Sequence, residues 1–382
     1  MTSKERKERR YQRRVAKRLK KKFDKLRYSN DYDSVFSYEN LYKAYKHCRK
    51  GVAWKTSVQK YITQAPLEVY KTYLQLQAGR YKSPGFYEFD LYERGKRRHI
   101  QSTSIRERVV QNCLCDNCLI PALQPSFIYD NGASMKNKGY TFAISRITEA
   151  LRKHYRRYGQ KGYVLVFDFS KFFDHVSHRL VKMSIAKKIT DERLKQISSH
   201  FIDAFGDIGL GLGSQISQVL ALASANRLDH FVKEMCKIKG YARYMDDGYL
   251  ISPSKDELKR CLKAIKGICD ELEIKLNKKK TQIVKLSHGF TWLKVRFFLT
   301  KTGKVIRKIY KRSVVKQRQK LKKLRKKLDK GLLDFQDICN SFQSWKAYAS
   351  NFNAYFAVKN MEALFRQLFY EELQINAIYQ IM

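Results

Sequence analysis

The sequence predicts an α+β protein built from two or three subdomains. Its 382 residues exceed what one small hydrophobic core requires, and 43% of them are apolar, which is enough to build several such cores. Apolar residues at helical spacing occupy both ends of the chain. Between them lie short β-prone runs whose tight-turn residues predict hairpins, and hairpins form antiparallel sheets. We therefore expect helical regions around a central antiparallel sheet.

The first predicted element is a helix over residues 3–28. About every second residue there is basic, and apolar residues recur near every fourth position, at Tyr11, Val15, Leu19, Phe23 and Leu26. This pattern predicts a basic amphipathic helix. It could be a solvated tail or an arm that contacts RNA, and the charge density favours the arm.

Residues 38–75 also have a helical pattern, after which a loop leads to an alternating strand at 86–92. Gly95 then turns the chain into a second, basic strand that begins at Lys96. Such a ribbon can close over a triphosphate, with Lys96 and Arg98 as charge-assisted donors. The alternative is that both side chains are ordinary surface charge, since hairpin tips are usually solvated.

Helical spacing returns over residues 104–122 and 141–158. The Gly- and Asn-rich loop between them, at 130–139, could pass close to a phosphate or a base. Three cysteines lie inside the first of these helices, at Cys113, Cys115 and Cys118. They have no fourth Cys or His nearby, so we expect them to pack as small apolar residues and not to bind a metal.

The most informative segments contain acids. An apolar run at 163–167 predicts a buried strand that ends at Asp168, and β-prone runs flank Asp246 and Asp247. Asp247-Gly248 is a strong tight-turn pair, so we expect a hairpin that holds Asp246 and Asp247 beside Asp168. Three carboxylates would then meet with no basic side chain between them. Their repulsion calls for divalent cations, and two Mg²⁺ ions, with Mn²⁺ as the alternative, are the usual solution for phosphoryl displacement.

The rest of the chain is predicted to contain further helices and strands. Helices are predicted over residues 182–205, 214–237 and 254–272, the last from a capping box of Ser254 and Glu257. Four glycines between residues 206 and 213 precede the second of these helices and allow close approach by a ligand. Strands are predicted near 281–286 and 290–299, a hairpin at Thr302-Gly303, a basic helix from 311, and two helical patterns over 334–372. This last part is expected to form a helical unit that grips a duplex.

Charge indicates the partner. Lys and Arg number 79 against 35 Asp and Glu, a net charge of +44, and an excess of this size favours a nucleic acid. No apolar stretch approaches the roughly 18 residues of a membrane span, and no secretory segment is evident at the N-terminus, so we expect a cytoplasmic protein without a membrane partner. The eight cysteines lack paired spacing and are expected to be reduced thiols.

These segments, in this order, resemble the reverse transcriptase family from about residue 40 to the C-terminus. Tyr244-Met245-Asp246-Asp247 resembles its YxDD box, and the segment from Phe167 to Asp174 resembles its first catalytic segment. The resemblance implies a right-hand polymerase with a basic arm at 1–39, fingers at 40–160, a palm with antiparallel sheet and helices at 161–300, and a helical thumb at 301–382. The implied activity is RNA-directed DNA polymerase, a nucleotidyltransferase that adds dNTPs to a primer 3′-OH while Asp168, Asp246 and Asp247 hold Mg²⁺.

The resemblance also implies roles for further residues. Phe173 corresponds to the steric gate against the ribose 2′-OH, and the backbone amides of Lys171 and Phe172 face the triphosphate. Phe169 is assigned to both the metal site and the nucleotide site. Lys280, before Thr281, corresponds to the lysine that protonates the leaving pyrophosphate. The primer grip corresponds to Phe290, Trp292 and Leu293, although Lys294 stands where the family usually has Gly.

A narrower resemblance lies at residues 212–218. The form Gly213-Ser214-Gln215-Ile216-Ser217-Gln218 resembles the enzymes of diversity-generating retroelements and neighbouring bacterial groups, some of them phage-defence reverse transcriptases. Leu212, Gly213 and Gln218 are assigned to the nucleotide site, and Leu212 replaces the usual Gln, which implies altered fidelity. The implied partners are a structured non-coding RNA template, a DNA or RNA primer, dNTPs, and an accessory protein or a second copy of the chain.

Two alternatives remain open at this point. The first is an RNA-dependent RNA polymerase, which shares the palm, and Phe173 argues against it. The second is a catalytically silent RNA-binding scaffold. A scaffold alone gives no reason to keep a mutually repulsive group of acids.

Overall fold

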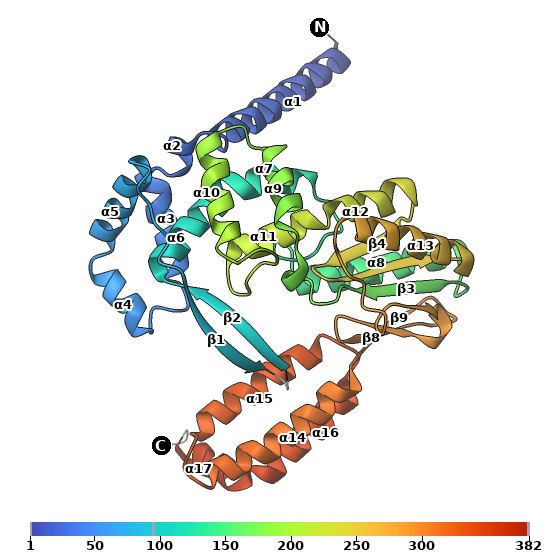
Figure 1. Cartoon of the computed structure of the whole chain (residues 1–382). Coiled ribbons are helices and arrows are strands. Elements are labelled where there is room, and N and C mark those ends of the chain that lie inside the picture. The colour runs from blue at the N-terminus through green and yellow to red at the C-terminus, as the bar shows by residue number, and fades with distance from the viewer. Residues whose placement is uncertain (1, 94–95, 380–382) are drawn as a thin grey trace.

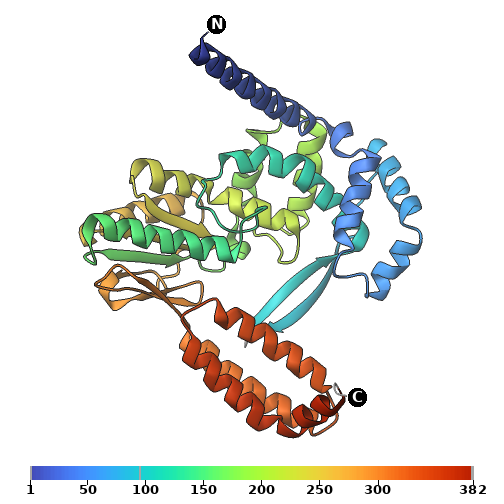
Figure 2. The same cartoon turned by 180° about the vertical axis from the view of Figure 1, so that it is seen from behind.

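The computed structural model describes residues 2–93 and 96–379. Helices and antiparallel sheets share the chain, which confirms the predicted α+β class. A long helix at the N-terminus projects from the central body, and a helical unit at the C-terminus is joined to that body by a small sheet (Figures 1 and 2). The overall arrangement is that of a right-hand polymerase fold. No helix in the described ranges is both long enough and apolar enough to cross a bilayer.

The N-terminal helix α1 runs from Ser3 to Tyr28, as its periodicity predicts, and about half of its residues are Lys or Arg. Both views show it extending away from the body (Figures 1 and 2). The chain enters the body at Ser29, which is buried, and Asp31 and Ser37 then cap the next two helices through their side chains. The helices that follow are α2 (Tyr32–Val35), α3 (Tyr38–Cys48), α4 (Thr56–Thr63) and α5 (Ala65–Gln77).

A two-stranded ribbon follows, formed by β1 (Phe86–Glu93) and β2 (Lys96–Thr103) in antiparallel register. It extends from the N-terminal helices toward the C-terminal helices in both views (Figures 1 and 2). Helices α6 (Ile105–Leu114), η1 (Cys115–Leu119), α7 (Ile120–Leu123), η2 (Gln124–Ser126) and α8 (Tyr140–Tyr158) come next. Cys113, Cys115 and Cys118 are all fully buried in the core, and burial raises the pKa of each thiol.

The central sheet has the strand order β4-β5-β3-β6 and is antiparallel throughout. Its strands are β3 (Tyr163–Asp168), β4 (Gly240–Tyr244), β5 (Asp247–Ser252) and β6 (Gln282–Lys285). Alternate side chains of β3 belong to different cores, because successive residues of a strand face opposite sides. Val164 and Val166 pack with α8, which covers the face seen in Figure 2, whereas Leu165 and Phe167 pack with the helices on the other face.

The helices on that other face come from the middle of the chain. They are η3 (Phe173–His175), α9 (His178–Ala186), α10 (Glu192–Asp203), α11 (Gln215–Ser224), α12 (Asn226–His230), η4 (Phe231–Met235) and α13 (Lys255–Glu271). The prediction of one continuous helix over residues 214–237 is wrong, because the backbone of Ala225 leaves helical geometry and η4 is a π-helical turn. Apolar periodicity predicted the buried face but does not report a local break in the backbone.

The C-terminal part begins with η5 (Leu286–His288) and a three-stranded sheet of β7 (Phe290–Trp292), β8 (Val295–Leu299) and β9 (Val305–Ile309). Four helices follow, α14 (Lys311–Leu328), α15 (Phe335–Ser350), α16 (Tyr355–Leu368) and α17 (Tyr370–Tyr379). They enclose their own core, formed by Leu321, Ile338, Phe342, Met361, Phe365 and Phe369. This core explains why the basic residues of α14 remain at the surface: its few apolar positions are used to pack against α15 and α16.

Candidate active site

The β4–β5 hairpin presents two acids at its tip. Tyr244 pairs with Asp247, so the two-residue turn consists of Met245 and Asp246, and Met245 has a φ of +55°. The expectation that Asp247-Gly248 would form the turn is wrong, since both residues lie in β5. Gly248 serves another purpose: a Cβ at this position would collide with the ring of Phe167 on β3. Glycine therefore allows the two strands to approach closely beside the acids.

Asp168, Asp246 and Asp247 converge at this end of the sheet. One carboxylate oxygen from each lies within 4.8 Å of the others. Asp168 ends β3 directly opposite Asp247, and the Phe169 N–H donates to the carbonyl of Asp246 at 3.0 Å, which ties the hairpin turn to the end of β3. The predicted meeting of the three acids is therefore present in the fold, and Asp168 is only 4% exposed.

The electrostatic cost of this arrangement appears in the pKa values of the acids. Burial raises the pKa of Asp247 to about 7, and the charges of Asp246 and Asp168 contribute to the shift. Burial also raises the pKa of Asp246, and Asp168 adds to this effect. Each cause disfavours an additional negative charge in a partly desolvated site.

A lysine shares the site, contrary to the expectation that no basic side chain lies between the acids. Lys280 Nζ lies 2.6 Å from Asp168 Oδ2, and Asn277 Nδ2 donates to Asp168 Oδ1 at 3.1 Å. Burial lowers the pKa of the Lys280 ammonium, but its hydrogen bond to Asp168 and the three carboxylate charges outweigh burial, so the pKa is raised. The lysine thus offsets part of the repulsion that the acids create.

The donor set fits Mg²⁺ or Mn²⁺. Both ions prefer carboxylate and carbonyl oxygens, and three carboxylates within 4.8 Å supply them without a Cys or His. The raised pKa values of Asp246 and Asp247 mark a concentration of negative charge that a dication would relieve.

A buried ion pair that no sequence motif predicts supports the turn between β4 and β5. Arg243 is fully buried, and its guanidinium binds Asp229 through Nε at 2.8 Å and Nη2 at 2.6 Å. Its Nη1 donates to the carbonyl of Met245, in the turn itself, at 2.8 Å, and Tyr241 donates to Asp229 at 2.6 Å. The only sequence signal is an arginine inside an apolar strand. Removing one partner would leave an uncompensated buried charge below Asp246.

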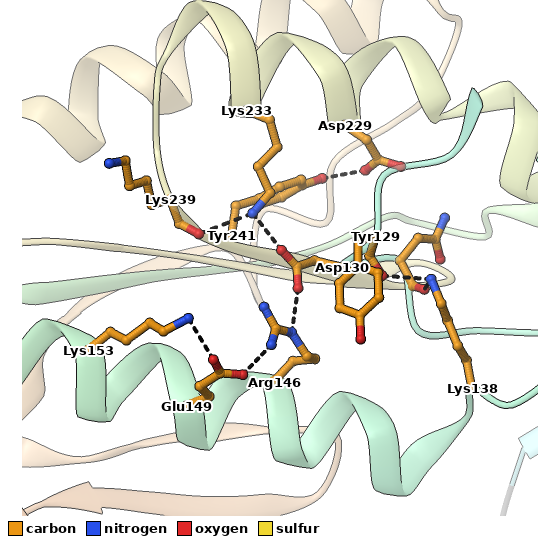
Figure 3. Close-up of polar contacts among 11 residues, drawn as sticks. Tyr129, Asp130, Lys138, Arg146, Glu149, Lys153, Asp229, Lys233, Lys239 and Tyr241 are labelled. Carbon is orange, nitrogen blue, oxygen red and sulfur yellow. Dashed lines mark hydrogen bonds and ion pairs between the residues drawn. The ribbon is translucent and has the colours of Figure 1, made fainter. Parts of the chain in front are cut away.

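The outer edge of β4 is covered by the loop at residues 128–139. Asn131 forms a parallel bridge with Arg243, and the Gly132 N–H donates to the carbonyl of Arg243 at 2.9 Å. Asp130 anchors the loop: Arg146 of α8 and Lys233 of η4 donate to its two carboxylate oxygens at 2.6 and 2.7 Å (Figure 3). The cover prevents strand pairing at this edge and fixes the hairpin that carries the acids.

The structure brings Phe173 and the glycine-rich segment together. The Leu210 N–H donates to the carbonyl of Phe173 at 2.8 Å, which places Leu212 and Gly213 shortly after that contact. Phe173 and Leu212 are half-buried, and Gly213 is exposed. The two segments that contain these three predicted nucleotide-site residues therefore lie next to each other. Gln218 is exposed on α11 and instead accepts a hydrogen bond from Ser134 of the covering loop, at 2.9 Å.

The turn after Asp168 contains the other predicted nucleotide-site residues. Lys171 has a φ of +46° and accepts from the Asp174 N–H at 3.0 Å. Within the part of the chain that the structure describes, the N–H groups of Lys171 and Phe172 have no protein partner. The side chains of Phe169 and Phe172 are buried, so only the backbone of either residue can reach a ligand.

The ribbon residues lie elsewhere. Arg98 is exposed on β2 and pairs with Leu91, on a ribbon that extends toward the C-terminal helices (Figure 1). The tip at residues 94–95 and the side chain of Lys96 lie outside the described residues. The base of the ribbon, in contrast, packs just before the glycine-rich segment: the rings of Phe86 and Phe205 are stacked with their centroids 4.8 Å apart. The roles of Lys96 and Arg98 remain predictions.

The predicted primer-grip residues form a β-turn against the central sheet. The side chains of Phe290 and Trp292 are buried, and Trp292 packs edge-on against Tyr249 of β5 with ring centroids 4.9 Å apart. Leu293 and Lys294 form the two-residue turn between β7 and β8, with φ of +46° and +63°. The carbonyl of Leu293 accepts from the Tyr140 hydroxyl at 3.2 Å. The two aromatic side chains thus position the turn, in which Leu293 is half-buried and Lys294 is exposed.

Comparisons with known proteins agree with this geometry. The family model described as "Reverse transcriptase (RNA-dependent DNA polymerase)" matches residues 82–297, more than half of the chain. Protein YkfC of Escherichia coli K12 is 25% identical over 248 residues, which are 52% of this chain and 62% of YkfC. The chain thus spans about three fifths of the length of this curated relative.

Two solved structures share a modest similarity. Telomerase from Candida albicans, in complex with a TWJ fragment of telomeric RNA, has a TM-score of 0.45 and 12% identity, over 68% of this chain and 55% of that chain. Apo telomerase from Candida tropicalis, truncated from its C-terminal domain, has a TM-score of 0.43 and 15% identity, over 58% of this chain and 55% of that chain.

Proposed function

Because the chain belongs to the reverse transcriptase family, we propose that it is an RNA-directed DNA polymerase that adds dNTPs to a primer 3′-OH. The observation that carries this proposal is the convergence of Asp168, Asp246 and Asp247 within 4.8 Å at the end of the central sheet. Two Mg²⁺ ions bound there would lower the pKa of the primer hydroxyl and neutralise the triphosphate. The ligands would be the three carboxylates and the backbone carbonyl of Phe169, since the side chain of Phe169 is buried.

The other residues are assigned to steps that the protein itself performs. The N–H groups of Lys171 and Phe172 are free to donate to the triphosphate. The Lys280 ammonium is assigned to donate a proton to the leaving pyrophosphate, and its contact with Asp168 holds it at the site beforehand. Phe173 is assigned as the gate against the 2′-OH, and Leu212 as an apolar contact that loosens base selection. Sequencing cDNA made on a defined RNA template measures that loosening as an error rate.

We further propose that the template is a dedicated structured RNA, in a retroelement or an antiphage defence system. Support comes from α1, whose basic residues lie on a helix that projects from the body, and from the basic α14. A short primer–template duplex does not require a separate basic arm of 26 residues. An accessory protein or a second copy of the chain remains a candidate partner.

Metal-dependent primer extension on an RNA template, with dNTPs and NTPs in parallel, tests the proposed activity. We expect Asp168→Asn and Asp246→Asn each to lose about 10³-fold or more in rate, because both remove a metal ligand. RNA affinity should remain close to that of the wild type, because binding draws on the net charge of +44. Asp270→Asn, on the exposed face of α13, removes the same charge away from the site and serves as the matched control.

The same assay separates the alternatives. Preferential use of NTPs would identify an RNA-dependent RNA polymerase, and absence of synthesis by the wild type with either substrate would leave a binding scaffold. Near wild-type dNTP incorporation by Asp246→Asn would reject the two-metal assignment.

A further inference from the structure

A cavity of about 520 Å³ lies at the opposite end of the β4–β5 hairpin from the acids. We call it the distal pocket; it is lined by the C-terminal half of α8, residues 237–240, the end of β5 and the start of α13. Gly240 pairs with Ile251 at this end of the hairpin, whereas Tyr244 pairs with Asp247 at the other. At ~3.3 Å per residue the two ends are about 13 Å apart. The distal pocket is therefore separate from the carboxylate site.

The charge of the distal pocket is strongly positive. Five basic side chains line it, Lys153, Arg156, Arg157, Lys237 and Lys239. Lys153 pairs with Glu149 at 2.6 Å, and within the described ranges the other four make no ion pair. The one carboxylate in the lining, Glu257, accepts a hydrogen bond from Ser252. Figure 3 shows Lys153 and Lys239 on the same side of the contacts around Asp130. Like charges gathered in a concave site favour an anionic ligand.

The pocket also offers an aromatic surface. Tyr158, at the end of α8, is 47% exposed and packs against His154 with ring centroids 5.2 Å apart. His154 is buried, its Nε2 lies 2.7 Å from the carbonyl of Lys161, and burial lowers the pKa of its ring. Tyr158 therefore packs on the buried ring of His154 and has exposed surface on which a base could stack. A volume of about 520 Å³ lies in the range of small-ligand sites.

We propose that the distal pocket is a second nucleotide-binding site. Arg156, Arg157, Lys237 and Lys239 would hold a phosphate, and Tyr158 would stack on the base. The nucleotide can be one unit of a single-stranded RNA or a free nucleoside triphosphate, because both present the same phosphate and base. Binding here does not involve Asp168, Asp246 or Asp247, so the inference is independent of the polymerase activity.

Two binding measurements distinguish these sources. The test variant combines Arg156→Gln, Arg157→Gln and Lys239→Gln. The matched control combines Arg260→Gln, Lys263→Gln and Lys266→Gln, which remove the same charge from an exposed face of α13 outside the pocket. The first probe is a fluorescent single-stranded RNA of about 12 nucleotides, a length within the site sizes of single-strand binders. The second is ATP in the presence of EDTA, which excludes metal-dependent binding at the acids.

We expect the test variant to lose about 10-fold or more in RNA affinity relative to the control variant. The slope of log affinity against log salt concentration should decrease in magnitude by up to about 2, because each phosphate contact contributes about 0.7 to this slope for single strands. Loss of RNA binding alone identifies an RNA strand as the ligand, and loss of ATP binding alone identifies a free nucleotide. Loss of both supports a site that accepts either.

Thermal unfolding checks that both variants are folded. In the wild-type protein, photocrosslinking of RNA that contains 4-thiouridine should label the peptide with Tyr158. Equal binding of both probes by the test and control variants, with no crosslink at that peptide, would overturn the proposal.

Discussion

At the residue scale, the acids of the site contribute to how the stability of the fold depends on pH. The pKa of Asp247 is raised to about 7, so this carboxyl favours folding below its ordinary pKa, near 4, and that contribution is lost as the pH rises through 7. The proposed Mg²⁺ ions would bind the ionised form of Asp247. We therefore expect the increase in Tm on adding Mg²⁺ to grow between pH 6 and 8. Calorimetry of the wild type and Asp247→Asn measures this, and an Mg²⁺ effect in the wild type that is independent of pH would contradict it.

The proposed sugar gate is a second feature of the residue scale. Phe173 is half-buried, and its carbonyl is held by Leu210, so truncation of the ring should leave the backbone in place. We expect Phe173→Ala to raise the use of ribonucleotides relative to deoxyribonucleotides, because it opens space beside C2′. The ratio of kcat/KM for dNTP and NTP measures this change. Phe172→Leu, at the adjacent buried position, is the control for general disturbance of the core. An unchanged ratio in Phe173→Ala would mean that Phe173 only packs the core.

At the scale of single elements, the β7–β8 turn stores backbone strain. Leu293 and Lys294 both have positive φ, a conformation that costs a residue with a side chain about 1–2 kcal/mol. We expect Lys294→Gly to stabilise the protein by ~1 kcal/mol in thermal unfolding, because glycine adopts this conformation without a steric cost. Lys266→Gly, at an exposed position of α13, should instead destabilise it by ~1 kcal/mol, because glycine is unfavourable within a helix. A decrease in Tm in both variants would show that the turn is not strained.

At the scale of the whole molecule, the proposed capture of RNA and the proposed synthesis use different parts of the chain. Helix α1 projects from the body, whereas the acids lie at the end of the central sheet. We expect deletion of residues 1–28 to weaken binding of structured RNA and to flatten its salt dependence, with a smaller effect on extension of a generic primer. Filter binding at several salt concentrations and primer extension on a short duplex measure the two effects.

The RNA that copurifies with the protein provides the complementary readout. Purification without nuclease treatment should yield one dominant RNA from the full-length chain, and the deletion should reduce its amount. A heterogeneous RNA pool that follows cellular abundance would reject a dedicated RNA and favour a non-specific polymerase.

Much of the fold could be predicted because its signals are local. The helix that ends at Tyr28, the strand that ends at Asp168 and the helix capped by Ser254 all follow from short-range patterns of apolar spacing and capping. The acids could be identified for the same reason, since each lies at the end of a short β-prone run. The turn between β4 and β5 was placed wrongly, because Asp247-Gly248 has turn chemistry but Gly248 is required by the ring of Phe167 across the sheet.

The sequence by itself determined the class of the fold, the three acids and the excess of positive charge. Charge follows directly from composition, and the fold class and the acids follow from patterns within short segments. Only the tertiary structure decided which distant groups meet. Lys280 and Asn277 reach Asp168 across 112 and 109 residues, and Asp229 lies under Arg243 because α12 packs below the sheet. The distal pocket likewise combines α8 with residues far along the chain. Such contacts depend on how complete helices and strands pack together. The spacing of residues within one helix or strand does not predict that packing.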